Sequence, residues 1–142
     1  MGLTFDGDVV GVQTKYKDQI EVLAATATES HVLYVTPYRM RLNAVRVIAR
    51  AAVTGDDTDR KNFNIINRGV DGSGSAELAA LDLATGVDLV AFDQKTIASG
   101  LSVDLPTGTV IAVEYEKIGS GVLIPDVTFE IDVTSSELAQ TS

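Results

Sequence analysis

The stretch Val127-Thr128-Phe129-Glu130-Ile131-Asp132-Val133 alternates apolar and polar residues without a break. A period of two places the four apolar side chains on one face of an extended chain and the polar side chains on the other. This pattern fits a β-strand with one buried and one hydrated face. Similar stretches recur along the chain, with glycine-rich segments between them. The sequence therefore predicts a two-layer β protein with acidic outer faces.

Further strands are predicted at 19–24, 31–38, 42–53, 62–67, 76–83, 97–105 and 109–118. In residues 42–53, Val45, Val47 and Ala49 share one face. Helix is the competing interpretation there, because Ala and Arg are good helix formers, but the valines favour a strand. The apolar spacing of residues 85–93 allows one or two helical turns. Seven or eight strands separated by Gly, Pro and Asp turns predict an all-β fold, either an antiparallel β-sandwich or a jelly-roll-like barrel.

The chain of 142 residues fits a single domain with terminal extensions. Glycines and charged residues interrupt the apolar pieces of the first 18 residues, which predicts an extended N-terminal arm. We therefore assign residues 1–28 to an arm and linker, 29–134 to the β-sandwich domain and 135–142 to a flexible C-terminal tail.

Composition excludes several classes of function. The net charge of −9, from 20 acidic and 11 basic residues, argues against nucleic-acid binding, which needs clustered Lys and Arg. The sequence contains no run of 18 apolar residues, so we predict no membrane-spanning helix. It also has no N-terminal apolar run of the kind found in a secretory signal. The chain has no cysteine, so disulfide and thiolate chemistry are unavailable.

Candidate catalytic and metal-binding residues are sparse. His31 is the single histidine, which excludes a site built from several histidines. The acidic loop with Asp56, Asp57 and Asp59 offers oxygen ligands for Ca²⁺, but it lacks the glycine and the glutamate of an EF-hand. Glu114, Glu116, Glu130 and Asp132 alternate with apolar residues, and they fit the hydrated face of a sheet with Arg46 and Arg50 as cross-strand partners. We predict a protein that is not an enzyme and that uses no cofactor or metal.

A resemblance to a known family lies in the order of strands and turns over about residues 33–133. It is carried by the segments 33–38 (LYVTPY), 42–47 (LNAVRV), 56–59 (DDTD), 65–69 (IINRG), 71–74 (DGSG) and 119–128 (GSGVLIPDVT). Together these segments resemble the small decoration, or cement, proteins of tailed bacteriophage heads. The resemblance implies a β-sandwich or jelly-roll subunit that assembles as a homotrimer. It also implies a place on the outer capsid surface of the virion, where the subunit binds the major capsid protein and bridges neighbouring capsomers.

The residues expected to contact a partner lie mainly in the arm. Exposed apolar residues on an extended segment suggest binding, and an arm that orders on binding can wrap a large surface. These residues are Leu3, Phe5, Val9, Val10 and Tyr16. Ile48 is the candidate for a subunit interface, because it interrupts the polar row between Arg46 and Arg50. A second packed layer within the same subunit is the other explanation for Ile48.

A second function stays open beside the capsid interpretation. A β-sandwich could instead be a glycan- or receptor-binding module of a virion fibre or of a cell-surface protein. Such a module would need an exposed aromatic residue or a calcium site in its loops. Residues 54–60 and 69–75 are the place where the sequence offers one.

Overall fold

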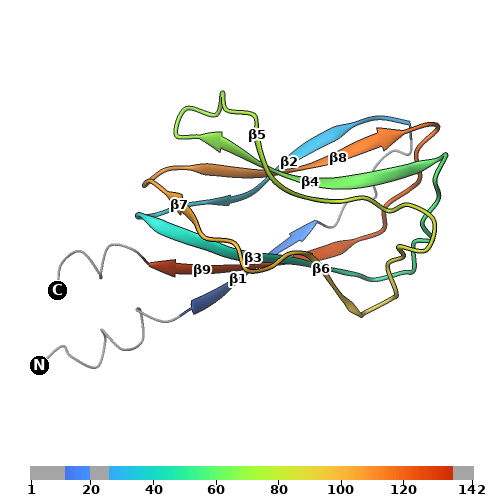
Figure 1. Cartoon of the computed structure of the whole chain (residues 1–142), viewed down its shortest axis with the longest axis horizontal. Helices are drawn as coiled ribbons and strands as arrows, with labels where there is room; N and C mark the ends of the chain where they lie inside the picture. Colours follow the sequence, from blue (N-terminus) through green and yellow to red (C-terminus); the bar gives the residue numbers. More distant parts are fainter. Residues whose placement is uncertain (1–11, 20–25, 136–142) are drawn as a thin grey trace, which may run out of the picture.

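A computed structural model describes residues 12–19 and 26–135 of the chain (Figure 1). Within these ranges the regular structure is entirely β-strand, and no helix there is long and apolar enough to cross a membrane. The strands are β1 (Val12–Gln19), β2 (Glu29–Val35), β3 (Met40–Ala49), β4 (Arg60–Gly69), β5 (Ala76–Leu81), β6 (Gln94–Ala98), β7 (Val103–Leu105), β8 (Val110–Ile118) and β9 (Val127–Ser135).

The strands form two antiparallel sheets that face each other (Figure 1). One sheet has the order β1-β9-β3-β6, with β7 also paired to β3, and the other has the order β2-β8-β4-β5. The pairs are nested along the chain, since β1 pairs with β9, β2 with β8, β3 with both β6 and β7, and β4 with β5. This nested order is that of a jelly roll. The predicted all-β sandwich is therefore confirmed.

The core lies between the two sheets and contains three aromatic rings in mutual contact. Phe63 on β4 packs edge-on against Tyr115 on β8, with ring centroids 5.3 Å apart, and against Phe129 on β9 at 6.2 Å. The alternation that opened the sequence analysis is confirmed, because Val127, Phe129, Ile131 and Val133 are all buried. One detail differs. Glu130 was expected on a hydrated face but is 7% exposed, because side chains of the neighbouring strands cover it.

Four further segments differ from expectation. Residues 12–19, which the sequence places in the arm, form β1 and pair with β9 along their whole length. The strand expected at 42–53 ends at Ala49, because Val53 instead forms an isolated bridge with Leu89. That bridge also replaces the helical turns considered for 85–93. Of the predicted tail, Ser135 is the buried last residue of β9. The predicted strand at 19–24 lies mostly outside the described residues.

The sandwich has two ends with different loops. At the terminal end, β1 begins, β9 ends and the β4–β5 turn projects (Figure 1). At the distal end, β3 stops at Ala49, and the segments 50–59, 82–93 and 119–126 connect the strands. The backbone amide of Arg50 donates to the carbonyl oxygen of Asp126 there, across 2.9 Å. The exposed apolar side chains described below are divided between these two ends.

Candidate binding surfaces

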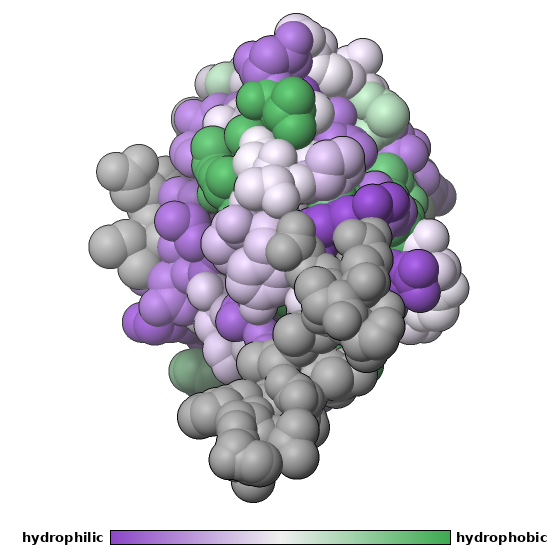
Figure 2. Space-filling view, turned by 90° about the vertical axis from the view of Figure 1, so that its left-hand side faces the viewer, coloured by the Kyte–Doolittle hydropathy of each residue, from purple (hydrophilic) through white to green (hydrophobic). Residues whose placement is uncertain are grey.

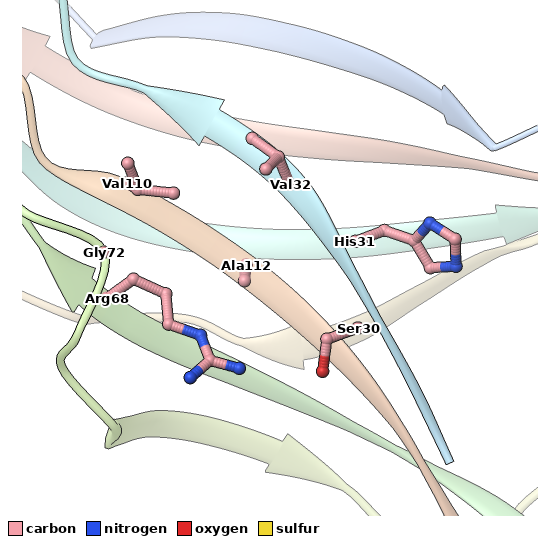
Figure 3. Close-up of a pocket in the computed structure, with 7 residues that line it drawn as sticks. All are labelled: Ser30, His31, Val32, Arg68, Gly72, Val110 and Ala112. Atoms are coloured by element: carbon pink, nitrogen blue, oxygen red, sulfur yellow. The ribbon is translucent and has the colours of Figure 1, made fainter. Parts of the chain in front are cut away.

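A shallow hollow of about 260 Å³ lies on the outer face of the β2-β8-β4 sheet (Figure 3). Val32, Val110 and Ala112 supply its apolar part, and Ser30, His31, Arg68 and Gly72 complete the lining. The register explains how these residues meet, because Val32 lies opposite Ala112 in the ladder of β2 with β8. In Figure 3 the guanidinium group of Arg68 extends past Ala112 towards Ser30, whereas the imidazole of His31 points away from it.

The β4–β5 turn fixes one rim of this hollow. The backbone amide of Gly74 donates to the carbonyl oxygen of Arg68 across 2.7 Å. A Cβ atom on Gly74 would meet the carbonyl oxygen of Asn67 at 2.8 Å, so the close approach requires glycine. Hydrogen bonds from the backbone amide and the hydroxyl of Ser73 hold the pKa of Asp71 below its usual range. The turn is therefore tied internally, and it positions Arg68 and Gly72 beside an apolar floor.

Exposed valines extend the hollow into an apolar surface at the terminal end. We call Val32, Val35, Val70 and Val110 the valine patch. Val35 lies opposite Val110 in the register of β2 with β8, and Gly69, which precedes Val70, lies opposite Val110 on the other side. Val32, Val35 and Val70 are 53%, 48% and 63% exposed. Figure 2 views this end and shows hydrophobic residues gathered in its upper part, with hydrophilic residues around them.

Phe92 is the most conspicuous apolar residue of the distal end. Its side chain is 75% exposed, and its backbone has a φ of 61°. A positive φ is a steric outlier for a bulky residue and costs roughly 1–3 kcal/mol. Val90 and Leu123, also more than half exposed, belong to loops of the same end. Strain that the fold tolerates at an exposed aromatic residue is an indication of a contact site.

A cluster of polar side chains lies inside the sandwich, between β2, β4 and β8. Lys61 is fully buried, and its ammonium group donates to the carbonyl oxygen of Ala27. Burial lowers the pKa of Lys61, and the nearby Glu29 carboxylate opposes that shift. The Tyr115 hydroxyl is buried without a hydrogen-bond partner among the described residues, and burial raises the pKa of this phenol.

His31 and Glu29 border this cluster without closing a hydrogen bond. Their nearest atoms, His31 Nε2 and Glu29 Oε2, are 4.0 Å apart, which exceeds hydrogen-bond distance. The imidazole packs edge-on against the Tyr115 ring, with centroids 5.7 Å apart. The cluster thus gathers a base, an acid, a lysine and a phenol, but no aligned donor and acceptor pair of the kind that proton transfer needs joins His31 to Glu29.

The acidic loop that was weighed as a Ca²⁺ site uses its carboxylates to hold loops together. Asp56 accepts hydrogen bonds from the backbone amides of Asp59 and Thr58, which lower its pKa. Asp57 accepts from the amide of Thr85 at 3.0 Å, and Asp59 accepts from the amide of Ser120 at 2.7 Å. Among the described residues, no group of three or more His, Cys, Asp or Glu could hold a metal ion.

The carboxylates of β9 form a charged network on the outer face of the other sheet. The Arg46 guanidinium approaches Glu130 at 3.4 Å and donates to Asp132 at 2.8 Å. The cross-strand pairing expected for Arg46 is confirmed at these two residues. The Gln94 side chain also donates to Glu130, which explains why Glu130 is buried. Asn62 and Asn64 donate in the same way to Glu114 and Glu116 on the opposite sheet.

The residues predicted to bind a partner are only partly within the described ranges. Leu3, Phe5, Val9 and Val10 lie outside them. Tyr16 lies on the outer face of β1, opposite Glu130, and is 66% exposed. Ile48 is half-buried on the outer face of β3, between Thr128 and Gln94. The structure therefore does not bring Tyr16 or Ile48 into the valine patch. Ile48 instead lies close to the Phe92 loop, because the Phe92 amide bonds to the carbonyl oxygen of the adjacent Ala49.

Sequence reasoning missed both apolar surfaces. The valine patch depends on the register between strands far apart in the chain, and no local pattern of residues marks it. Phe92 stands in a stretch that fitted helical turns, and nothing in its residue type signals a positive φ. No protein family, no curated protein and no solved structure matches this chain.

Proposed function

We propose that this protein is a non-enzymatic structural protein of a tailed-phage virion, which binds the outer surface of the head as a trimer and bridges neighbouring capsomers. One observation carries the proposal. Exposed apolar side chains lie at both ends of the sandwich, with the valine patch at the terminal end and Phe92, Val90 and Leu123 at the distal end. A bridging protein needs two separate contact surfaces, and this arrangement provides them.

The remaining surface supports the same proposal. Each outer face is crossed by ordered pairs of charged and amide side chains, such as Arg46 with Asp132 and Asn64 with Glu114. The net charge of −9 opposes nonspecific association of free trimers. Apolar contacts at the two ends can then act where the copies meet a shell. Each bound copy stabilises the assembled shell relative to its separated capsomers, by mass action.

The chain enters the sandwich at the terminal end. β1 begins at Val12 at the same end as the valine patch, and Leu3, Phe5, Val9 and Val10 precede it in the sequence. We assign these four residues to the contact with the major capsid protein, as the sequence predicted.

The deciding experiment measures binding to emptied heads of the phage whose genome encodes the chain. The purified protein is mixed with heads, the heads are sedimented, and the bound fraction is quantified. We expect saturable binding, and light scattering of the free protein should give a mass near three times 15.0 kDa. A chain that stays in the supernatant overturns the proposal, and retention of that chain on a glycan array would identify a receptor-binding module instead.

Surface variants show whether both ends take part. Phe92→Ala and Val70→Ser each remove an exposed apolar side chain, one from each end. We expect each to weaken head binding about ten-fold or more, as truncation of an anchor residue does at interfaces. Glu77→Gln, at an exposed position of β5, is the matched control and should bind as the parent does. If neither end variant affects binding, the two-ended bridge is wrong.

A further inference from the structure

The first strand differs from the other long strands because it adds nothing to the core. None of the eight residues of β1 is buried, whereas every other strand of six or more residues except β5 contributes at least one buried side chain to the core. The residues of β1 that face inward lie opposite Val133, Ile131, Phe129 and Val127. They are all polar: Gln13, Lys15, Lys17 and Gln19. Burial of apolar surface therefore does not hold β1 in place.

What holds β1 is its backbone ladder with β9. Eight residue pairs run from Val12 with Thr134 to Gln19 with Val127. Two exposed side-chain hydrogen bonds accompany the ladder, from Thr14 to Asp132 at 2.8 Å and from Thr128 to Asp18 at 2.7 Å. Such contacts depend on the strand sequence, and they do not depend on which copy of the chain supplies the strand.

β9 would keep its place if β1 left. On its other side β9 pairs with β3 from Ser135 with Met40 to Val127 with Ala49. Its apolar side chains pack between the sheets, where Phe129 meets Phe63 and Tyr115. β1 is also an outermost strand of its sheet. Its departure therefore breaks one ladder and uncovers no layer of the core.

We propose that β1 is exchanged between copies, so that β1 of one chain pairs with β9 of a second copy in the assembled protein. The inference deepens the proposed function, on which it rests, because exchanged strands would tie adjacent subunits of the decoration together. Swapping an identical element replaces each contact with the same contact, so it is a low-cost route to an oligomer. The sequence joins Gln19 to Glu29 through residues 20–28, which can span roughly 35 Å when extended.

The register identifies a second copy as the partner. Thr14 and Asp18 of β1 stand opposite side chains of β9 that hydrogen-bond with them. The strand edge that complements β1 is therefore the edge of β9, which every copy of this chain carries. Lysines at positions 15 and 17 also disfavour pairing of the free edge of β1 with unrelated strands, as charged residues on edge strands do.

Disulfide trapping tests the exchange, because the chain has no cysteine of its own. Thr128 in β9 lies opposite Asp18 of β1 on one side and opposite Ile48 of β3 on the other. Cross-strand pairs have Cα separations that a disulfide accepts. The single variants Asp18→Cys, Thr128→Cys and Ile48→Cys are purified separately, with the Thr128→Cys chain isotopically labelled. Two mixtures are then incubated and oxidised, Thr128→Cys with Asp18→Cys and Thr128→Cys with Ile48→Cys.

Exchange predicts disulfides between chains in the first mixture, about ten-fold or more above the second, because only β1 is brought to β9 of another copy at high effective concentration. Mass spectrometry of the labelled junction peptide gives the ratio. The double variant Asp18→Cys/Thr128→Cys should likewise join separate chains. Closure within single chains, equal yields in the two mixtures, or no disulfide at all would overturn the exchange. The assay uses the purified chain without heads, so its failure is separate from a failure to bind them.

Discussion

Phe92 donates its backbone amide to the carbonyl oxygen of Ala49, the last residue of β3, across 2.7 Å. The bond ties the loop before β6 to the end of the strand with which β6 pairs. Phe92 itself has a positive φ, within a turn closed by the bond from the Asp93 amide to the Val90 carbonyl oxygen, and the residue is 75% exposed. The isolated protein thus keeps an aromatic ring in water on a strained backbone, which is the reason to expect a partner for this residue.

Two substitutions of Phe92 test whether its backbone is strained. Phe92→Gly should raise the free energy of unfolding by about 1 kcal/mol, because glycine adopts a positive φ without a steric cost. Phe92→Ala keeps the Cβ atom and therefore the strain, so its stability should match that of the parent within about 0.5 kcal/mol. Urea denaturation measures both. Equal stability of the glycine and alanine variants would show that the backbone at Phe92 is unstrained.

Removal of the Tyr115 hydroxyl should not destabilise the core. The oxygen is buried without a hydrogen-bond partner in the described part of the chain, and an unsatisfied buried group carries a desolvation cost. Tyr115→Phe should therefore raise the free energy of unfolding by about 1 kcal/mol. Tyr115→Leu, which removes the ring packed against Phe63, should lower it by about 3 kcal/mol. Thermal unfolding distinguishes the two. A clear loss in the phenylalanine variant would mean that the hydroxyl is hydrogen-bonded.

Lowering the pH should reduce the stability of the fold through protonation of Asp132. The hydrogen bond from Arg46, and then that from Thr14, lower the pKa of Asp132 from its usual 3.8. A carboxyl with a lowered folded-state pKa stabilises the fold above its unfolded-state pKa, and this contribution disappears as the pH falls through the folded-state value. Stability should thus decrease below about pH 4. Asp132→Asn should flatten this decrease, whereas Asp93→Asn, at an exposed position, should leave the curve unchanged. Identical slopes for the two variants would exclude the Arg46 contact as the cause.

Two glycines with positive φ should respond differently to alanine. At Gly72, φ is 80° and nothing lies within 4 Å of an added Cβ, so Gly72→Ala should cost only the backbone strain of about 1 kcal/mol. At Gly119, φ is 63°, and the added atom would lie 2.0 Å from the carbonyl oxygen of Thr58. Gly119→Ala should therefore cost about 3 kcal/mol or more. Chemical denaturation compares them, and similar losses would mean that the 54–60 loop moves aside freely.

Local pattern predicted the strands that carry alternating residues. β9 and β4 were placed from their own residues, because each has one apolar row that only an extended chain can bury, with Phe129 and Phe63 at the centre. β1 was missed because its inward-facing residues, Gln13, Lys15, Lys17 and Gln19, form no apolar face. It is held by backbone pairing to a distant strand, which produces no hydrophobic periodicity in the sequence. The same absence of a local signal explains the bridge between Val53 and Leu89.

The sequence by itself determined an all-β sandwich with an acidic, cysteine-free body, because period-two burial is a property of each strand separately. Only the tertiary structure decided which residues are exposed and which residues from distant strands lie side by side. Val35 meets Val110 only through register, Glu130 is buried only because Arg46 and Gln94 come from neighbouring strands, and the Phe92 loop is tied to the sandwich only through the carbonyl oxygen of Ala49. These relationships mostly connect residues that are distant in the chain, so the physical forces that fix them act only once the strands have paired within each sheet.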